Sequence, residues 1–346
     1  MLPLSEIARL RATVDTEWRS PVADAVGVTW SIAPGRSRWW RSSASHVFVV
    51  PGSETEPRRY LRFVPTGTPQ ALALAQGASQ LVEWADDGLG AVRPLVSIDG
   101  TLTPTVTTSL GEMIAMLVDE VPGEEVDADD LDEARAREWG AALARVHLSP
   151  STGADRPVSR SAGILDDPVH DAVVALQSAV DELTLADAPR GAVHGDFELD
   201  NVRFDASGVT FFDADDSGSD LLAVDIAHAL RDIDGGALGA ETSPSLVAAF
   251  FAGYDAVRPR TQTERGHERF FSLVASARFV CRLPDALDAR GDDGSASWLR
   301  DLRGDLDAHF DWHAARIVSE APAAIEALRV TCRSAPQPGR RAEGRR

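Results

Sequence analysis

The most telling part of the chain is residues 194–201, which read His194-Gly195-Asp196-Phe197-Glu198-Leu199-Asp200-Asn201, together with Phe211-Phe212-Asp213 shortly after. A carboxylate such as that of Asp196 can accept the proton of an attacking hydroxyl group. Asn201 and Asp213 offer hard oxygen atoms of the kind that Mg²⁺ takes as ligands. The pattern therefore predicts Asp196 as a catalytic base and the other two residues as metal ligands.

The residues around this stretch favour a functional site over a plain turn. A His-Gly-Asp triplet alone fits a turn with a capping aspartate. Ala192-Val193, however, is typical of the end of a short strand, and Val209 to Phe212 is an apolar strand that would deliver Asp213 at its end. The combination indicates phosphoryl transfer, because that reaction needs a positioned base and a metal clamp but no nucleophilic serine or cysteine.

Further segments resemble one protein superfamily. Trp139 to His147 resembles the helix ending in Leu-Ala-x-Leu-His that precedes the catalytic loop of the aminoglycoside phosphotransferase and choline kinase superfamily. Val224-Asp225-Ile226-Ala227 resembles the start of its Asp-Leu-Ala helix. Gly195 to Asn201, with Asp213-Ala214-Asp215-Asp216, is most similar to its bacterial phosphotransferase enzymes. The resemblance covers residues 25 to 330.

The resemblance implies an α+β, two-lobed, protein-kinase-like fold, with a small antiparallel-sheet N-lobe and a larger, mainly helical C-lobe. It also implies transfer of the γ-phosphate of ATP or GTP to a hydroxyl group of a small molecule, with Mg²⁺ as the cofactor. Asp225 would then brace the catalytic loop. We expect His194 to order this loop rather than to carry a proton. Asp215 is either an additional magnesium ligand or a solvated loop acid.

The order of helix and strand signals predicts the organisation of the chain. We expect an N-terminal helix that packs on the body (1–24), an N-lobe with the nucleotide-binding sheet (25–118), a hinge (119–123), a helical C-lobe with the catalytic loop and acceptor site (124–333) and a disordered tail (334–346). The expected strands are Val28 to Ile32, His46 to Val50, Arg59 to Val64, Thr101 to Thr107 and Met113 to Val118. The expected helices are residues 1–20, Gln70 to Ala85, Asp132 to His147, Pro168 to Leu183, Leu221 to Arg231, Leu246 to Val257, Arg265 to Arg282 and Ala296 to Ser319.

The nucleotide-binding side departs from the pattern of the superfamily. Where the superfamily usually has a strand lysine, this chain has Arg62, which keeps the charge but not the compact geometry of an ammonium group. Arg62 either clamps the phosphates or is a surface-facing arginine on its strand. The helix expected to carry its glutamate partner offers Gln76, Gln80 and Glu83 on one face, so the sequence does not choose among them.

Two other segments are candidates for nucleotide binding. Ser43 and Ser45 belong to a stretch of small residues that would let backbone amides approach the phosphates, with a plain hairpin turn as the alternative. In the hinge, we expect the adenine ring to bind the backbone near Asp119 and Val121.

Composition excludes several classes of function. With 34 basic and 54 acidic residues the net charge is −20, which disfavours nucleic acid and anionic membranes as partners. The chain has no lysine, which excludes a P-loop and lysine Schiff-base chemistry. Cys281 and Cys332 indicate neither a disulfide scaffold nor a zinc site. We expect a cytoplasmic protein whose partners are a nucleoside triphosphate and a small hydroxyl acceptor.

The identity of the acceptor stays open at this point. Cationic antibiotics of the aminoglycoside type, amino alcohols, sugars and homoserine-like compounds all fit. A weakened kinase-fold protein that only binds a nucleotide or small molecule is the alternative, because the lysine is missing. A metal-dependent phosphoesterase is disfavoured, because the Asp-x-His at 307–309 lies downstream of the loop, not upstream. The acidic residues that would suit a cationic acceptor, if they line the cleft, are Asp232, Asp234, Asp285 and Asp288.

Overall fold

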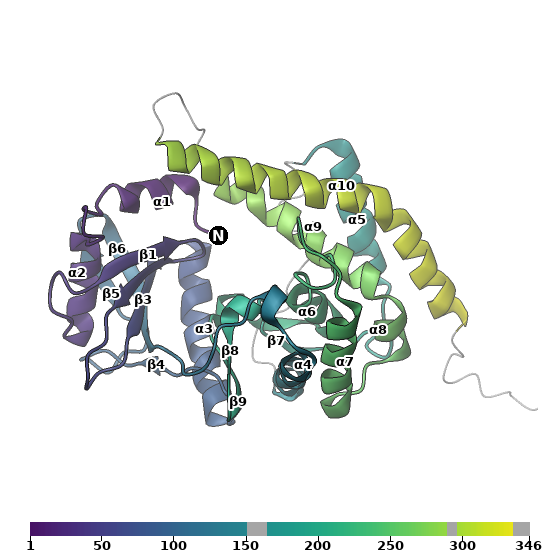
Figure 1. Cartoon of the computed structure of the whole chain (residues 1–346). Helices are drawn as coiled ribbons and strands as arrows, with labels where there is room; N and C mark the ends of the chain where they lie inside the picture. The colour runs from purple at the N-terminus through teal and green to yellow at the C-terminus, as the bar shows by residue number, and fades with distance from the viewer. Residues whose placement is uncertain (151–164, 289–295, 335–346) are drawn as a thin grey trace, which may run out of the picture.

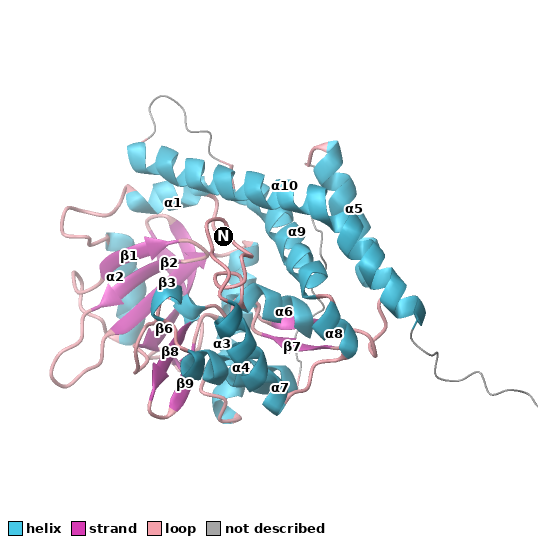
Figure 2. Ribbon diagram, turned by 45° about the vertical axis from the view of Figure 1, so that its right-hand side comes forward, coloured by secondary structure: helices cyan, strands magenta, loops and turns pink. Residues whose placement is uncertain are grey.

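A computed structural model describes residues 1–150, 165–288 and 296–334. Figure 1 shows a small lobe built around a β-sheet beside a larger lobe of helices, and Figure 2 shows the same division from another side. The α+β, two-lobed architecture predicted from the sequence is confirmed. The predicted tail begins at the last helical residue, and the rest of it, 335–346, lies outside the described residues.

Within the described residues, the small lobe is built on a six-stranded antiparallel sheet in the order β1-β2-β3-β6-β4, with β5 also paired to β6. The strands are rich in β-branched and aromatic residues, as expected of a half-buried pleated surface. Arg62 lies in β3 between Val47 and Met116 of the two neighbouring strands, so it occupies the middle of the sheet. The strands are β1 (Arg38–Ser42), β2 (His46–Val50), β3 (Arg59–Pro65), β4 (Pro94–Leu95), β5 (Thr105–Thr108) and β6 (Gly111–Asp119).

The large lobe is mainly helical, and its helices begin at recognisable caps. The Asp132 side chain accepts a hydrogen bond from the backbone N–H of Arg135 at the start of α4, and proline occupies the first turn of α5 and α7. Two short two-stranded sheets, β7 with β10 and β8 with β9, carry the predicted catalytic segments. The strands are β7 (Arg190–Val193), β8 (Val202–Asp205), β9 (Gly208–Phe211) and β10 (Gly218–Leu221), and the helices are α3 (Pro69–Asp86), α4 (Glu133–Leu148), α5 (Asp167–Asp181), α6 (Leu222–Ala229), α7 (Pro244–Val257), α8 (Gln262–Gly266), α9 (Glu268–Ala286) and α10 (Ser297–Ser334).

Two predictions for the N-terminal residues are wrong. The first helix, α1 (Leu4–Arg11), does not continue to residue 20, because a turn follows in which Asp15 accepts backbone N–H groups. Ser20 then caps α2 (Pro21–Gly27), which runs into a 3₁₀ turn, so the predicted strand Val28 to Ile32 does not form. Ile32 is nevertheless buried against the sheet, as its apolar character indicated.

Most other predicted elements are present with ends shifted by a few residues. Strand β1 was not predicted, and β5 occupies only the end of the predicted strand Thr101 to Thr107. The helix predicted for Arg265 to Arg282 is divided into α8 and α9 at His267. Helix α10 continues to Ser334 instead of ending near Ser319.

Helix α3 connects the two lobes. It packs against β3 and β6 of the sheet and also against the turn at 214–216 of the large lobe. The same hydrophobic core includes Trp84 of α3, Trp139 of α4 and two phenylalanines of the predicted catalytic segments, Phe197 and Phe211. The candidate catalytic segments therefore rest directly on the core.

A second connection between the lobes is made by α1 and α10, on the side of the molecule opposite to β8. Figures 1 and 2 show α10 crossing above both lobes, whereas β8, which pairs with the chain just after the predicted hinge, lies below. Helix α1 contacts α10, and the backbone N–H of Ser5 donates to Asp288 Oδ1 at 3.0 Å. The Ser5 hydroxyl donates to the other oxygen of the same carboxylate. The two lobes are thus joined above and below.

Candidate active site

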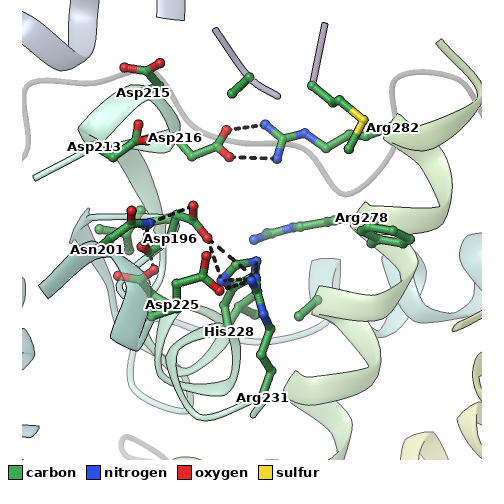
Figure 3. A pocket seen from close by; sticks show the side chains of 18 of the residues that line it. Asp196, Asn201, Asp213, Asp215, Asp216, Asp225, His228, Arg231, Arg278 and Arg282 are labelled. Carbon is green, nitrogen blue, oxygen red and sulfur yellow. Dashed lines mark hydrogen bonds and ion pairs between the residues drawn. The ribbon is translucent and has the colours of Figure 1, made fainter. Parts of the chain in front are cut away.

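The candidate site is a cavity of about 400 Å³ between the lobes. Its walls come from the turn between β1 and β2, from the loop after β7, from the turn after β9 and from one face of α9. Figure 3 shows the carboxylates of the large lobe on one side of this cavity and arginine side chains on the other. The predicted site residues that line it are Ser43, Asp196, Asn201, Asp213, Asp215 and Asp225.

Asp196 is oriented by its neighbours in the catalytic loop. The backbone turns at Gly195, where a φ of 83° favours glycine. Asn201 Nδ2 donates hydrogen bonds to the main-chain oxygen of Asp196 at 2.9 Å and to its Oδ2 at 3.0 Å. The other carboxylate oxygen, Oδ1, lies 3.5 Å from both His228 Nδ1 and Arg231 Nη1. One oxygen of Asp196 is therefore fixed by the loop, and the other is directed to the cavity.

Asp225 holds the backbone of this loop. Its carboxylate accepts hydrogen bonds from the backbone N–H groups of His194 at 2.9 Å and Gly195 at 2.8 Å. Its Oδ2 also contacts His147 Nε2 at 3.0 Å, and His147 Nδ1 contacts Tyr254 Oη at 2.6 Å. Burial would raise the pKa of Asp225, but the hydrogen bond and charge of His147 and the charge of His194 lower it to about 2. These contacts support the predicted role of Asp225 as a brace.

His194 has the surroundings of a structural side chain. It is fully buried, and its ring stacks on Trp84 with 5.8 Å between the ring centroids. Its Nε2 donates to the main-chain oxygen of Phe212 at 3.1 Å, which ties the catalytic loop to the strand that carries Asp213. Burial lowers the pKa of His194. These contacts support loop ordering rather than proton transfer as its role.

The turn after β9 presents the acidic residues predicted to bind a metal. Asp213 adopts a left-handed backbone conformation, with φ of 64° and ψ of 57°. The N–H of Phe212 donates to the main-chain oxygen of Asn201 at 3.1 Å, so this turn lies against the catalytic loop. Asp215 is almost fully buried, and burial raises its pKa to about 7, although the nearby Arg62 opposes the rise. Its Oδ1 has no hydrogen-bond partner among the described residues.

The donor set of this turn fits a divalent cation. A buried carboxylate oxygen without a partner is costly, and a bound cation would relieve that cost. No group of three or more His, Cys, Asp and Glu residues in the described ranges could hold a metal by itself. An ion at Asn201, Asp213 and Asp215 would therefore take further oxygens from water or phosphate, as Mg²⁺ commonly does.

Arg62 points from the sheet into the turn after β9, residues 213–216, which we call the acidic turn. Its Nη2 is 2.8 Å from Asp213 Oδ1 and 2.7 Å from Asp215 Oδ2, and its Nε donates to Ser45 Oγ at 3.2 Å. The side chain is buried, and the charges of the two aspartates raise its pKa against the effect of desolvation. Of the two alternatives left by the sequence, the surface-facing arginine is excluded.

Helix α3 approaches the acidic turn at a glycine. A Cβ atom on Gly77 would lie 2.7 Å from the main-chain oxygen of Ala214 and 2.9 Å from the N atom of Asp215. Only glycine permits this distance without a shift of backbone. Farther along α3, Gln80 Nε2 donates to Glu83 Oε2 at 3.2 Å. Arg62 thus pairs at short distance with two carboxylates of the acidic turn. The sequence did not indicate these two pairs.

The other predicted nucleotide-binding residues are divided between the cavity and its surroundings. Ser43 lines the cavity at the turn between β1 and β2, so this hairpin turn faces the site. Ser45 is buried beside Arg62. The Asp119 side chain pairs with Arg59, and Val121 is partly buried on the core; neither lines the cavity.

Sequence reasoning missed the basic wall of the cavity. His228 lies one helical turn after Asp225, a spacing that could have revealed it, and Arg231 follows α6. Arg278 and Arg282 come from α9, and no local pattern links this helix to the catalytic loop. None of the four acidic residues suggested for a cationic acceptor lines the cavity; these are Asp232, Asp234, Asp285 and Asp288.

Among the described residues, no helix combines the length and the apolar character needed to cross a lipid bilayer.

Solved structures of small-molecule kinases share the fold. An amicoumacin kinase in complex with AMP-PNP, Ca²⁺ and Ami superposes with a TM-score of 0.69, at 14% identity, over 90% of this chain and 96% of that one. A microcompartment-associated aminopropanol kinase gives a TM-score of 0.62, at 16% identity, over 89% of this chain and 98% of that one. The architecture is therefore that of the kinase-like phosphotransferases.

Sequence comparison identifies the family. The model of the phosphotransferase enzyme family matches residues 41–263, more than half of the chain, so the chain belongs to this family, within the superfamily predicted from the sequence. Homoserine kinase of Gluconacetobacter diazotrophicus is 33% identical over 218 residues. That match covers 57% of this chain and 64% of the relative, slightly less than two thirds of its length.

Proposed function

We propose that the protein is a phosphotransferase that moves the γ-phosphate of ATP or GTP to a hydroxyl group of a small molecule. The observation that carries the proposal is the position of Asp196 beside Asn201 on the wall of the cavity that Asp213 also lines. Phosphoryl transfer depends mostly on positioning and on stabilisation of charge. A directed base next to oxygen ligands for a cation supplies both.

In the proposed reaction, the acceptor oxygen forms a bond to the γ-phosphorus while the bond from that phosphorus to the β,γ-bridging oxygen breaks. The hydroxyl proton moves to Oδ1 of Asp196, the oxygen that is not hydrogen-bonded to Asn201. His228 and Arg231 keep this oxygen directed to the cavity. The products are a phosphorylated acceptor and a nucleoside diphosphate.

Asn201, Asp213 and Asp215 are the residues that would hold Mg²⁺, which when bound neutralises charge on the phosphate oxygens. Arg62 would stay close enough to contact the same phosphates, because its guanidinium already reaches both aspartates. This role replaces that of the usual lysine.

The remaining nucleotide contacts come from the small lobe. The turn containing Ser43 and Ser45 would cover the phosphates through its backbone N–H groups. Residues 119–123 would form the hinge, with the adenine ring against the backbone near Asp119 and Val121. This arrangement also sets the proposed boundary between the N-lobe (25–118) and the C-lobe (124–333).

Acceptors with both an amino and a hydroxyl group are the candidates that the relatives support. Homoserine kinase and aminopropanol kinase are named after small molecules of this type. A larger cationic antibiotic is a further candidate, since the amicoumacin kinase has the same fold.

The test is release of nucleoside diphosphate with Mg²⁺ and a panel of these acceptors, using both ATP and GTP. We expect Asp213→Ala to abolish turnover and Asp196→Asn to reduce kcat by about 10²- to 10⁴-fold while nucleotide still binds. Asp200→Asn is the matched control, because Asp200 is an exposed acid of the same loop that does not line the cavity. Wild-type turnover by Asp213→Ala would disprove the proposal.

A protein that binds a nucleotide or small molecule without catalysis is the second candidate. The observation in its favour is that Arg62 pairs with both aspartates needed for the metal. Thermal-shift titration with AMP-PNP separates the two candidates. Nucleotide binding by the wild-type protein, without product from any acceptor, would favour this one.

A further inference from the structure

The wall of the cavity opposite the acidic turn is basic. Arg278 and Arg282 lie four residues apart on the face of α9 that lines the cavity, and Arg231 adds a third guanidinium beside them. Two like charges at this spacing on one helix face repel each other slightly. The spacing itself therefore does not stabilise the helix, but it brings both side chains to the cavity, where they can contact a ligand.

Among these arginines, Arg278 is the one held most firmly. Its Nη2 donates to Asp220 Oδ1 at 2.7 Å, and its Nη1 donates to the other oxygen of that carboxylate. Asp220 is buried, and the pairing of β10 with β7 fixes its position next to the catalytic loop. The guanidinium plane of Arg278 is therefore oriented before any ligand binds, which lowers the entropy that binding would cost.

The hydrogen-bonding capacity of Arg278 exceeds what the protein uses. A guanidinium has five N–H donors, and Asp220 takes two of them. Arg278 Nε is buried, so the donors left for a ligand are the second N–H groups of Nη1 and Nη2. By contrast, Arg282 pairs with Asp216 at the exposed rim, with 60% of its side chain exposed, against 14% for Arg278.

Arg278 also has the right position to contact an acceptor. Figure 3 shows its side chain extending from α9 toward Asp196, between the Asp216–Arg282 pair and the His228–Arg231 group. A molecule only a few bonds long could therefore place one group against Arg278 and its hydroxyl group at Asp196. Ala275, Phe279 and Leu283 give the wall around Arg278 an apolar surface, which strengthens a charged contact there.

We propose that Arg278 binds an anionic group, a carboxylate, of the acceptor, and that the acceptor is a small hydroxy acid or hydroxyamino acid. This inference rests on the proposed phosphotransferase function and narrows its substrate class. The positive charge of Arg278 and the N–H groups of Nη1 and Nη2 that Asp220 does not take suit a carboxylate better than a neutral or cationic group. Arg278 is therefore the specificity-determining residue that separates hydroxyamino acids from amino alcohols.

The experiment compares acceptors that differ only in the carboxylate. Suitable pairs are L-homoserine with 3-aminopropan-1-ol, L-serine with ethanolamine, and glycerate with ethane-1,2-diol. For at least one pair, we expect the wild-type protein to show a kcat/KM about 100-fold higher with the acid. A wild-type preference for the carboxylate-free member of every pair that reacts would overturn the inference and leave the phosphotransferase function intact.

Variants then assign the preference to Arg278. Arg278→Lys keeps the ion pair with Asp220 but removes the fork, and Arg278→Gln combined with Asp220→Asn leaves no unpaired buried carboxylate. Both are expected to raise KM for the acid more than KM for the carboxylate-free member, and the double variant to remove the preference. Arg269→Gln, which removes an arginine of the same helix that pairs with Glu320 outside the cavity, is the control. An equal loss with both members of a pair would show a merely structural role and overturn the inference.

A binding measurement separates this inference from the function on which it rests. Calorimetric titration of the same hydroxy acids, with AMP-PNP and Mg²⁺ present, does not need turnover. Binding of an acid that depends on Arg278, without product from any pair, would support the inference and contradict the phosphotransferase function. Absence of both binding and product would overturn both.

Discussion

The catalytic loop and the phosphate side of the cavity differ in what holds their charged groups. The loop is held by Asp225, whose partners are backbone N–H groups and the buried His147, none of which a substrate would need. Arg62, on the other side, is held by Asp213 and Asp215, the residues proposed to bind the metal. A bound cation would compete for these carboxylates. The catalytic loop is thus held by the protein alone, whereas Arg62 would have to share or exchange its partners with a cation bound at Asp213 and Asp215.

The largest effect is expected from breaking the support of the catalytic loop. Asp225→Asn puts an NH₂ group where the carboxylate now accepts several hydrogen bonds, so at pH 7 we expect the free energy of unfolding to fall by about 2 kcal/mol or more, with a loss of kcat. Urea unfolding and turnover measure the two effects. Unchanged stability at pH 7 would contradict the account of this brace.

The same variant has a defined dependence on pH. The pKa of Asp225 is lowered from 3.8 to about 2 in the folded protein, so the ionised carboxylate contributes stability above pH 3.8 and loses that contribution as the pH falls through 2. The difference between wild type and Asp225→Asn should therefore be constant from pH 7 to about 4 and decrease below it. A difference that decreases already between pH 7 and 5 would point to another group.

An intermediate effect is expected where α3 meets the acidic turn. Gly77→Ala would bring a Cβ atom to 2.7 Å from the Ala214 oxygen, so either α3 or the turn must move. We expect a loss of about 1–3 kcal/mol in the free energy of unfolding and a weaker response to Mg²⁺ in thermal-shift titration. Gly304→Ala in α10 is the control, because nothing lies within 4 Å of the added atom there. Equal behaviour of the two variants would mean that the turn adapts freely.

The smallest effect is expected from Arg62→Lys. One nitrogen of Arg62, Nη2, makes both ion pairs, so an ammonium group can keep these pairs and loses only the hydrogen bond from Nε to Ser45 Oγ. We expect kcat/KM for the nucleotide to stay within about tenfold of wild type, whereas Arg62→Gln should lose about 100-fold through the missing charge. A Lys variant as inactive as the Gln variant would show that the guanidinium fork itself is needed.

The sequence predicted the parts of the site that depend on local spacing. Asp196 and Asn201 belong to one loop, and a hairpin of adjacent strands brings Asp213 to it, so short-range pattern was sufficient. The Arg62–Asp215 pair was not predicted, because it depends on how closely α3 and the sheet approach the large lobe. The same holds for Arg278, whose place is set by the packing of α9 against α6.

For the fold, the sequence-based prediction was wrong where a run of apolar residues was assigned to a strand instead of a helical turn. Val28 to Ile32 is apolar enough for a strand, but Ser20 and Pro21 start a helix whose last turn continues through Trp30. The capping residues were the better signal. Within β2 and β3, by contrast, no competing cap exists, and both strands formed as predicted.

The contact between Ser5 and Asp288 affects how the lobes can move. A lobe attached at one place can swing in any direction, but a lobe attached at two opposite places can only rotate about the line between them. Here one attachment is the segment just after β6, where Glu124 pairs with Phe204 of β8, and the other is α1 against α10 and Asp288. Both attachments restrict how the small lobe can move against the large lobe, and removal of the Ser5–Asp288 contact would weaken one of them.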